Sequence, residues 1–376
     1  MRRLVVATTV PVTAWTLMRG QLWYLREHGF DVVLVSSPGE LLDATGRREG
    51  VRTRAVPMAR EVRPLTDLHA LGLLIRTFRA ERPDVSLVST PKAGLLAGLV
   101  AFVTRVPLRI YLLRGLRLET ARPAQRRVLW LMEWISLHVA HDVIAVSPSL
   151  LRRARELRLI GRGRGVVLGR GASNGVDLER FATTAARQAA GLALRRRLGI
   201  PDDAFVFGFV GRMSLDKGLA ELADAFARVT AACSTAWLMI VGEEDGAAVS
   251  TRLLSLDRVR STGWLTEPDT AYHAMDALVL PTHREGFPNA CLEAAAAGKP
   301  VITTTATGAV DSVVDGVSGI LVPPRNADAL CAALCRLATD RHCAVSMGRA
   351  GIDFVSRHYS NDIVWRDLTE FIEGRS

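Results

Sequence analysis

The chain has 376 residues, of which 49% are hydrophobic and 23% charged, and its formal net charge at pH 7 is +10. This length exceeds one ordinary core and the composition excludes a disordered chain, so two domains of roughly 150 to 200 residues are expected. Five cysteines occur without a C-x-x-C or zinc-ligand spacing. A disulfide-stapled or zinc-bound scaffold is therefore disfavoured, and reduced thiols in the cytoplasm are expected.

The positive charge is concentrated in the first half. Residues 1–170 contain 28 Lys+Arg against 13 Asp+Glu, and nearly all of the basic residues are arginine. Such a surface suits phosphate groups, an anionic membrane or nucleic acid. The alternative is a compositional bias, because only three of the 48 basic residues in the whole chain are lysine.

Neither of the longest apolar stretches, 93–104 and 128–140, reaches the roughly 18 residues that a membrane span requires. The opening residues 1–11 imitate a signal peptide, but they lead directly into a helical pattern and predict a first strand.

The first half alternates short apolar runs with helical stretches, the pattern of a doubly wound parallel sheet. Its predicted strands are 4–8, 32–36, 85–89, 108–113 and 143–146, with helices at 16–28, 65–82, 92–104, 124–141 and 149–157. Residues 160–170 predict a loop into a last short strand. The turn-rich segment 171–177 marks the crossing to the second domain.

The alternation restarts after a helix at 182–198. Predicted strands are 205–210, 238–241, 259–261, 277–280, 301–304 and 320–322, with helices at 218–229, 250–255, 290–297, 327–338 and 345–354. A last helix at 361–373 has an apolar face but does not connect two predicted strands. We therefore expect Rossmann-like domains at 1–170 and 171–358, followed by a C-terminal segment, 359–376, that packs on the first domain.

Two carboxylates, Glu285 and Glu293, flank a Gly-Phe-Pro-Asn corner in the second half. The apolar run 277–280 predicts a strand that Pro281 stops, and 290–297 predicts a helix, so the corner is a strand-to-helix turn. At the carboxyl edge of a parallel sheet such a turn faces a ligand. Carboxylates accept hydrogen bonds from sugar hydroxyls, so a sugar-containing ligand is favoured.

Two cations, Arg212 and Lys217, lie in a glycine-bounded turn after the strand 205–210. They are placed to hold a diphosphate and to neutralise the charge that develops when a glycosyl bond breaks. Taken alone, two such cations are more often solvated turn residues. Together the four residues could bind all parts of a nucleotide sugar. Arg212 and Lys217 would hold the diphosphate, Glu285 the sugar and Glu293 the ribose.

These motifs resemble the retaining glycosyltransferases of family 4, which have the GT-B fold of two Rossmann-like domains facing across a cleft. The matching stretches are Gly211-Arg212 with Lys217-Gly218, Asn174-Gly-Val-Asp177, Val241-Gly-Glu243, the E-x7-E pair Glu285 and Glu293, and Asp315-Gly-Val-Ser-Gly-Ile-Leu-Val-Pro323. The resemblance implies catalytic roles for Glu285, Arg212 and Lys217. It implies donor binding by Arg212, Lys217, Glu285, Gly286, Phe287, Pro288, Asn289 and Glu293.

The first half is similar to a narrower group that builds capsule, exopolysaccharide or lipopolysaccharide units on polyprenyl-linked acceptors. The matching stretches are Ser36-Ser-Pro-Gly39, Thr90-Pro-Lys-Ala-Gly-Leu-Leu96, Leu113-Arg-Gly-Leu-Arg117 and Ser147-Pro-Ser149. Two departures stand out. Thr8-Thr-Val-Pro11 replaces the glycines after the first strand, and Arg114-Gly115 replaces a His-Gly whose histidine contacts the donor sugar. The acceptor-side candidates are Thr9, Lys92, Arg114 and Glu119.

Three residues of the first half allow two interpretations each. Lys92 opens a helix, where a cation opposes the helix dipole, so it either binds an anion or is a solvated lysine. Trp130 and Trp134, beside Arg126 and Arg127, form either a membrane-facing stripe or part of the core.

The residues and the resemblance together predict a glycosyltransferase, and the resemblance implies that it retains the anomeric configuration. No metal ion or cofactor is expected. The enzyme would move a hexose or N-acetylhexosamine from a nucleotide diphosphate donor, UDP by resemblance, to a lipid-linked or glycan acceptor. We expect a cytoplasmic protein that contacts an anionic membrane through its basic half. The alternatives are a nucleotide-sugar epimerase or hydrolase of the same fold and a nucleic-acid-binding protein, which no RNA- or DNA-reading motif supports.

Overall fold

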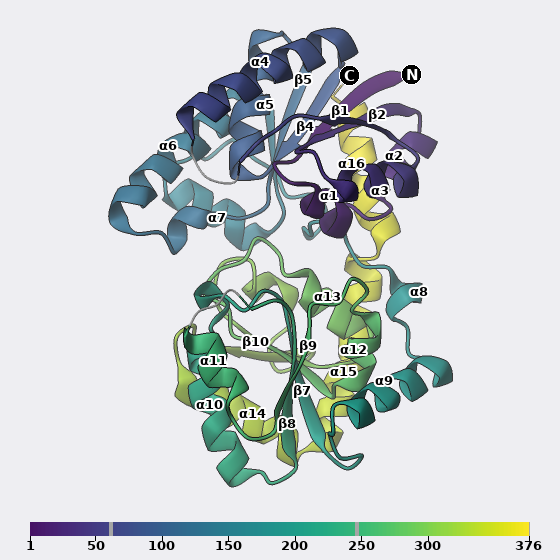
Figure 1. Ribbon diagram of the computed structural model, residues 1–376, viewed down its shortest axis with the longest axis vertical. Coiled ribbons are helices and arrows are strands. Elements are labelled where there is room, and N and C mark those ends of the chain that lie inside the picture. Colours follow the sequence, from purple (N-terminus) through teal and green to yellow (C-terminus); the bar gives the residue numbers. More distant parts are fainter. Residues whose placement is uncertain (60–62, 245–247, 376) are drawn as a thin grey trace. The chain divides into compact units, whose positions relative to one another are not determined.

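The computed structural model describes residues 1–59, 63–244 and 248–375, which form two compact units. Unit 1 comprises Met1–Asn174 with Asn361–Ser376, and unit 2 comprises Gly175–Ser360. Each unit contains a six-stranded parallel sheet covered by helices (Figure 1). This is the doubly wound α/β architecture predicted from the sequence.

The sheet of unit 1 has the strand order β3-β2-β1-β4-β5-β6. Its strands are β1 (Arg2–Ala7), β2 (Phe30–Ser36), β3 (Arg52–Ala55), β4 (Val85–Ser89), β5 (Leu108–Leu113) and β6 (Asp142–Ala145). The inner strands are buried along most of their length, as expected where helices cover both faces. The order reverses between β1 and β4, so loops after these two strands meet at the carboxyl edge.

Two groups of helices cover this sheet. α4 (Pro64–Glu81), α5 (Pro91–Val103) and α6 (Pro123–Val139) pack in succession, and α1 (Pro11–Leu17), α2 (Gln21–Glu27) and α3 (Glu40–Glu49) pack together. α7 (Pro148–Glu156) follows β6. The C-terminal helix α16 (Asn361–Glu373) packs on α2, and its Trp365 donates from Nε1 to Asn174 Oδ1 at 2.8 Å.

The sheet of unit 2 has the order β12-β11-β10-β7-β8-β9. Its strands are β7 (Phe205–Val210), β8 (Ala236–Val241), β9 (Val259–Gly263), β10 (Ala277–Leu280), β11 (Val301–Thr304) and β12 (Gly319–Val322). α10 (Leu219–Ala232) packs with α11 (Ala248–Leu254) and α14 (Ala327–Thr339). α9 (Ala185–Arg197), α12 (Asp269–Ala274), α13 (Asn289–Ala296) and α15 (Arg341–His358) cover the sheet elsewhere. Here the order reverses between β7 and β10.

The helix predicted over 16–28 is wrong, because the structure has two helices there, α1 and α2, separated at Gly20. Gly20 has φ 77°, and a Cβ at this position would lie 2.5 Å from the ring of Trp365. The close approach of α16 thus requires a glycine in the left-handed region, which breaks the helical path.

Several short elements escaped prediction: β3, α3, α12 and the one-turn helix α8 (Leu178–Phe181). β3 reads Arg-Thr-Arg-Ala and is an edge strand with mostly exposed side chains, so it carries no apolar run. The short strand predicted near the end of 160–170 is reduced to a single bridge between Ile144 and Val166. No helix within the described ranges is long and apolar enough to cross a bilayer.

A buried carboxyl group lies between α6 and the sheet of unit 1. Tyr111 of β5 donates its hydroxyl to Glu133 Oε2 at 2.8 Å, and both side chains are buried. Burial raises the pKa of Glu133 to about 7, and the hydrogen bond from Tyr111 offsets only part of this rise. The folded state therefore holds a proton on Glu133 at pH values where an unfolded chain has lost it.

We expect the free energy of unfolding of unit 1 to fall as the pH rises, because the folded state binds a proton at Glu133 more tightly than the unfolded chain does. The contribution is fully present below the ordinary pKa of 4.5 and is lost as the pH passes through about 7. The whole shift corresponds to about 3 kcal/mol. In Glu133→Gln this part of the pH dependence should disappear, which urea unfolding followed at several pH values would measure. An unchanged pH dependence in the variant would contradict the assignment.

Candidate active site

The candidate site of unit 2 lies where two neighbouring strands end. β7 and β10 pair in parallel, and the strand order of the sheet reverses between them. Lys217 lies in the 3-10 turn η2 (Leu215–Lys217) after β7, and Glu285 lies in the loop after β10. Loops at such a reversal form the ligand sites of open α/β sheets.

Lys217 and Glu285 form an ion pair between Nζ and Oε1, although they are 68 residues apart in the chain. Their side chains are only 18% and 14% exposed. The structure thus brings together two residues that the sequence assigned to one ligand. A phosphate that approaches this pair competes with the carboxylate for the ammonium group.

Asp216, which sequence reasoning did not select, joins the two loops. Its Oδ2 accepts from Arg284 Nη2 at 2.7 Å, and its Oδ1 accepts from the Ser214 hydroxyl at 2.6 Å. Its backbone carbonyl accepts from the His283 amide at 2.8 Å. Asp216 therefore links the loop that carries Lys217 to the loop that carries Glu285. In the sequence, its position directly before Lys217 was the one indication of this role.

The charges around Asp216 keep it ionised. Burial would raise its pKa, but the Ser214 hydroxyl and the cations Arg284, Lys217 and Arg212 together lower it below its usual range. Arg212 lies two residues after the end of β7, and its side chain is exposed. Arg212 thus contributes positive charge near Asp216, whereas Lys217 is the residue that pairs directly with Glu285.

Gly218 holds the turn of Lys217 against the end of β10. It has φ 74°, and a Cβ here would lie 1.9 Å from the carbonyl oxygen of Pro281. A side chain would thus be strained by the backbone conformation and would also collide with backbone. This close approach places Lys217 within reach of Glu285.

Glu293 lies on α13 and has a partner that the sequence did not reveal. Tyr272 of α12 donates its hydroxyl to Glu293 Oε2 at 2.5 Å. Burial raises the pKa of Glu293, while the hydrogen bond from Tyr272 and the charge of Arg180 partly offset the rise. α12 was not predicted, so Tyr272 was missed.

The corner between the two carboxylates has the predicted strand-to-helix form. Phe287 is buried and its ring packs against Tyr359, with centroids 5.2 Å apart. Pro288 is the N-cap residue of α13 and Asn289 its first residue. Asn289 Oδ1 is buried and has no hydrogen-bond partner among the described residues. Gly286 is also buried, so the corner is a packed turn rather than a free loop.

In unit 1, the acceptor-side candidates Thr9 and Lys92 have local partners. Thr9 Oγ1 lies 2.7 Å from Thr90 Oγ1 and accepts from the Ala93 amide at 3.1 Å, so it ties β1 to the start of α5. Lys92 Nζ pairs with Asp67 Oδ1 of α4 at 2.7 Å and is buried. The solvated interpretation of Lys92 is therefore wrong, and Asp67 already neutralises the ammonium group.

The other two candidates follow β5. Glu119 Oε1 accepts from Arg153 Nε of α7 at 3.0 Å. Arg114 donates from Nη1 to the Ser173 hydroxyl, a partner that the sequence did not indicate. The four candidates thus come from segments that follow β1, β4 and β5, and each of them has a protein partner that limits its freedom.

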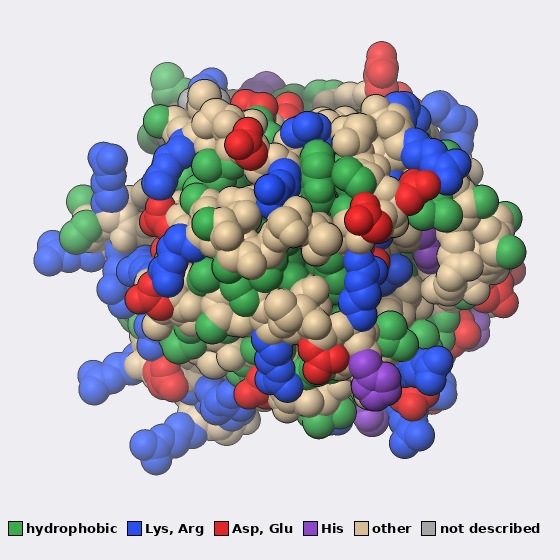
Figure 2. Space-filling view, turned by 90° about the horizontal axis from the view of Figure 1, so that it is seen from below, with side chains coloured by type: hydrophobic (Ala, Val, Ile, Leu, Met, Phe, Trp, Pro, Cys, Tyr) green, Lys and Arg blue, Asp and Glu red, His purple; other side chains and the backbone are tan. Residues whose placement is uncertain are grey.

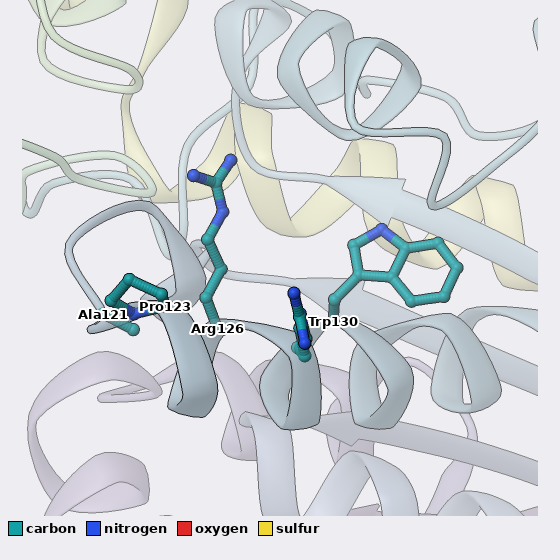
Figure 3. A pocket seen from close by; sticks show the side chains of 5 residues that line it. Ala121, Pro123, Arg126 and Trp130 are labelled. Carbon is teal, nitrogen blue, oxygen red and sulfur yellow. The ribbon is translucent and has the colours of Figure 1, made fainter.

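The two tryptophans of α6, Trp130 and Trp134, differ in how far they are exposed. Trp134 is 37% exposed, so the core interpretation is wrong for this residue. Trp130 is partly buried and donates from Nε1 to the carbonyl of Leu157 at 2.9 Å. A pocket of about 440 Å³ lies beside it, at the start of α6 (Figure 3). Its lining residues are Ala121, Pro123, Arg126, Arg127 and Trp130.

Known proteins resemble both halves of the chain. A family model described as "Glycosyl transferase 4-like domain" matches residues 14–171, and "Glycosyl transferases group 1" matches residues 204–340. The capsular polysaccharide biosynthesis glycosyltransferase CapM of Staphylococcus aureus is 36% identical over 358 residues, which cover 94% of this chain and 92% of CapM. The chain is a family 4 glycosyltransferase. The resemblance recognised in its motifs is confirmed.

A second relative of this glycosyltransferase is the UDP-Gal:alpha-D-GlcNAc-diphosphoundecaprenol alpha-1,3-galactosyltransferase of Escherichia coli. It is 25% identical over 327 residues, which cover 83% of this chain and 81% of the relative. Among solved structures, Anabaena HepE in complex with UDP and glucose superposes with a TM-score of 0.81 at 19% identity, covering both chains fully. WaaG of lipopolysaccharide biosynthesis gives 0.74 at 12% identity, covering 99% of this chain and 100% of WaaG. These likenesses establish the predicted GT-B fold.

Among the residues described, no group of three or more His, Cys, Asp or Glu side chains is arranged to hold a metal ion. All five cysteines are free thiols.

Proposed function

We propose that this glycosyltransferase moves a hexose or N-acetylhexosamine from a UDP-linked donor to a polyprenyl-linked or other glycan acceptor in surface-polysaccharide synthesis. The observation that carries the proposal is the Lys217–Glu285 pair at the carboxyl ends of β7 and β10. The relatives support it: CapM is named for capsular polysaccharide biosynthesis, the E. coli relative for a UDP-Gal donor and a diphosphoundecaprenol acceptor, and HepE was solved with UDP.

The proposed chemistry retains the anomeric configuration. The bond from the sugar C1 to the diphosphate oxygen breaks, and a bond from C1 to the acceptor oxygen forms on the same face. The acceptor proton passes to the leaving diphosphate. Lys217 and Arg212 neutralise the charge that builds on that diphosphate, which is transition-state stabilisation and requires no metal ion in this proposal.

Glu285 and Glu293 have different tasks in this scheme. When a donor diphosphate takes the ammonium group of Lys217, the carboxylate of Glu285 is released to accept hydroxyls of the sugar and to face its positively charged transition state. Glu293 accepts from the ribose hydroxyls, and Tyr272 fixes its orientation through the 2.5 Å hydrogen bond. Gly286, Phe287, Pro288 and Asn289 shape the wall of the donor site.

A panel of nucleotide sugars tests the donor class directly. At a concentration a hundred times its dissociation constant, a true donor should add about 2.7 kcal/mol to the stability of the chain, which thermal unfolding detects. Incubation of the best donor with a lipid-linked acceptor and NMR of the product then report the anomeric configuration, with and without EDTA. An inverted product, or activity abolished by EDTA, would contradict the corresponding part of the proposal.

Two other functions make distinct predictions. An epimerase or hydrolase would consume the donor without an acceptor, so donor turnover in its absence would favour that class. A nucleic-acid-binding protein would remain on an immobilised polyanion at several hundred millimolar salt. On the one face that Figure 2 shows, basic and acidic side chains are interspersed. A nucleic-acid-binding protein is expected to carry a basic patch or stripe.

We also propose that α6 meets the cytoplasmic surface of an anionic membrane. Val128, Leu131 and Trp134 are 51%, 52% and 37% exposed on this helix. Arg122, the N-cap residue, and Arg126 and Arg127 of the first turns are exposed; Figure 3 shows Arg126 near Trp130. Exposed apolar side chains beside several arginines match the boundary between acyl chains and anionic head groups.

Sedimentation with lipid vesicles tests this contact. We expect the protein to bind vesicles that contain phosphatidylglycerol and to bind pure phosphatidylcholine vesicles at least tenfold more weakly, because each arginine near the surface contributes about 1 kcal/mol. The double variant Arg126→Gln/Arg127→Gln should lose most of this binding. The control Arg349→Gln/Arg357→Gln removes two exposed charges from α15. Equal losses in both variants, or none in the first, would contradict the α6 surface.

A further inference from the structure

The guanidinium group of Arg114 in unit 1 is held at one nitrogen and has no carboxylate partner among the described residues. Nη1 donates to the Ser173 hydroxyl and lies 3.4 Å from the Ser173 carbonyl oxygen. The other two guanidinium nitrogens, Nε and Nη2, are buried and have no hydrogen-bond partner among the residues that the structure describes. Ser173 therefore fixes one corner of the group and leaves the opposite edge without an acceptor.

The two unpartnered nitrogens share one edge of the planar guanidinium. The Nε–H and Nη2–H bonds of an arginine point in the same direction, and this edge binds two oxygens of one carboxylate or phosphate through parallel hydrogen bonds. A water molecule satisfies such an edge less well, since it offers one oxygen. The pattern of satisfied and unsatisfied nitrogens in Arg114 thus fits a ligand with two oxygens.

The electrostatics of Arg114 agree with this geometry. Burial lowers its pKa to about 10, and within the described part of the chain no carboxylate opposes that effect. Removing one partner from a buried pair of charges is costly because an uncompensated charge remains. Arg114 is in that situation without a ligand, so an oxyanion that reaches it is stabilised strongly.

The fold adds a second source of positive potential nearby. The amide of Ala172, next to Ser173, donates to the carbonyl of Val146 at 2.8 Å. Val146 immediately precedes Ser147, the N-cap of α7. The tip of Arg114 is thus anchored to the segment that borders the N-terminus of this nine-residue helix. Helix N-termini favour anions.

We propose that the Nε–Nη2 edge of Arg114 binds a phosphate group, and that the diphosphate of a lipid-linked acceptor supplies it. The second clause rests on the proposed function. Of the four acceptor-side candidates, Thr9 bonds to Thr90, Lys92 pairs with Asp67 and Glu119 is acidic. Arg114 is the one whose free edge matches an oxyanion. It is a specificity residue for the acceptor in this assignment.

Inorganic pyrophosphate in the presence of saturating UDP tests the site, because UDP occupies the donor site at Lys217. Wild-type protein should bind one pyrophosphate per chain in calorimetry and unfold at a higher temperature. Arg114→Gln should lose this response, with binding at least tenfold weaker. Arg114→Lys should also bind more weakly, since lysine keeps the charge but not the parallel bonds. The control Arg117→Gln removes an exposed arginine three residues away and should respond like wild type.

Three results would overturn the proposal. Wild-type protein with UDP that binds no further pyrophosphate would exclude the site without any variant, even if Arg114→Gln fails to fold. Equal pyrophosphate binding by Arg114→Lys and wild type would remove the bidentate assignment. Stabilisation by glucuronate instead of pyrophosphate would show a carboxylate site. Pyrophosphate binding at Arg114 without sugar transfer would contradict the proposed function and leave the anion site intact.

Discussion

Replacing Lys217 by alanine is expected to lower kcat for sugar transfer by about two to three orders of magnitude, the effect of removing one preorganised electrostatic group. The ammonium group of Lys217 forms an ion pair with Glu285. Without it, the charge on the leaving diphosphate lacks its nearest counter-charge, and Glu285 is left without its partner. Steady-state kinetics with the best donor and a lipid-linked acceptor measure the loss.

Two controls separate this role from a structural one. Lys217→Arg keeps the charge and should retain more activity than Lys217→Ala. Acceptor KM should change little in either variant, because acceptor recognition is assigned to unit 1. If Lys217→Ala raised the acceptor KM as much as it lowered kcat, or if thermal unfolding showed that unit 2 had lost its fold, the assigned role would be wrong.

The sequence was sufficient to predict every strand of the two sheets except β3, and to predict that Lys217 and Glu285 lie at one edge of a sheet. β10 and β11 have the predicted bounds because each is a short buried apolar run between turn residues. Lys217 and Glu285 come together because parallel strands bring their carboxyl ends to one edge, even when 68 residues separate them. Hydrophobic periodicity and the topology of parallel sheets are therefore enough to predict that these two distant residues lie close together.

Features that depend on packing between distant segments could not be predicted. β3 is an exposed edge strand whose polar side chains give no alternation. The break at Gly20 depends on Trp365, which is more than 300 residues away. Lys92 was interpreted from its own helix alone, whereas its partner Asp67 lies on α4. Tyr272 belongs to a six-residue helix, too short for a periodic signal.

Glu285→Gln is expected to separate catalysis from donor binding. The amide still accepts hydrogen bonds from sugar hydroxyls, but it carries no charge to face the positively charged transition state, so kcat should fall by at least about a hundredfold. UDP should bind as tightly as before or several-fold more tightly, because Lys217 no longer has to leave a carboxylate before it meets the diphosphate. Calorimetry with UDP measures the second effect.

The control Asp353→Asn removes an exposed carboxylate of α15 and should change neither quantity. UDP binding that weakened in parallel with kcat would mean that Glu285 supports the nucleotide rather than the sugar, and the ion pair would then be a structural clamp on the two loops.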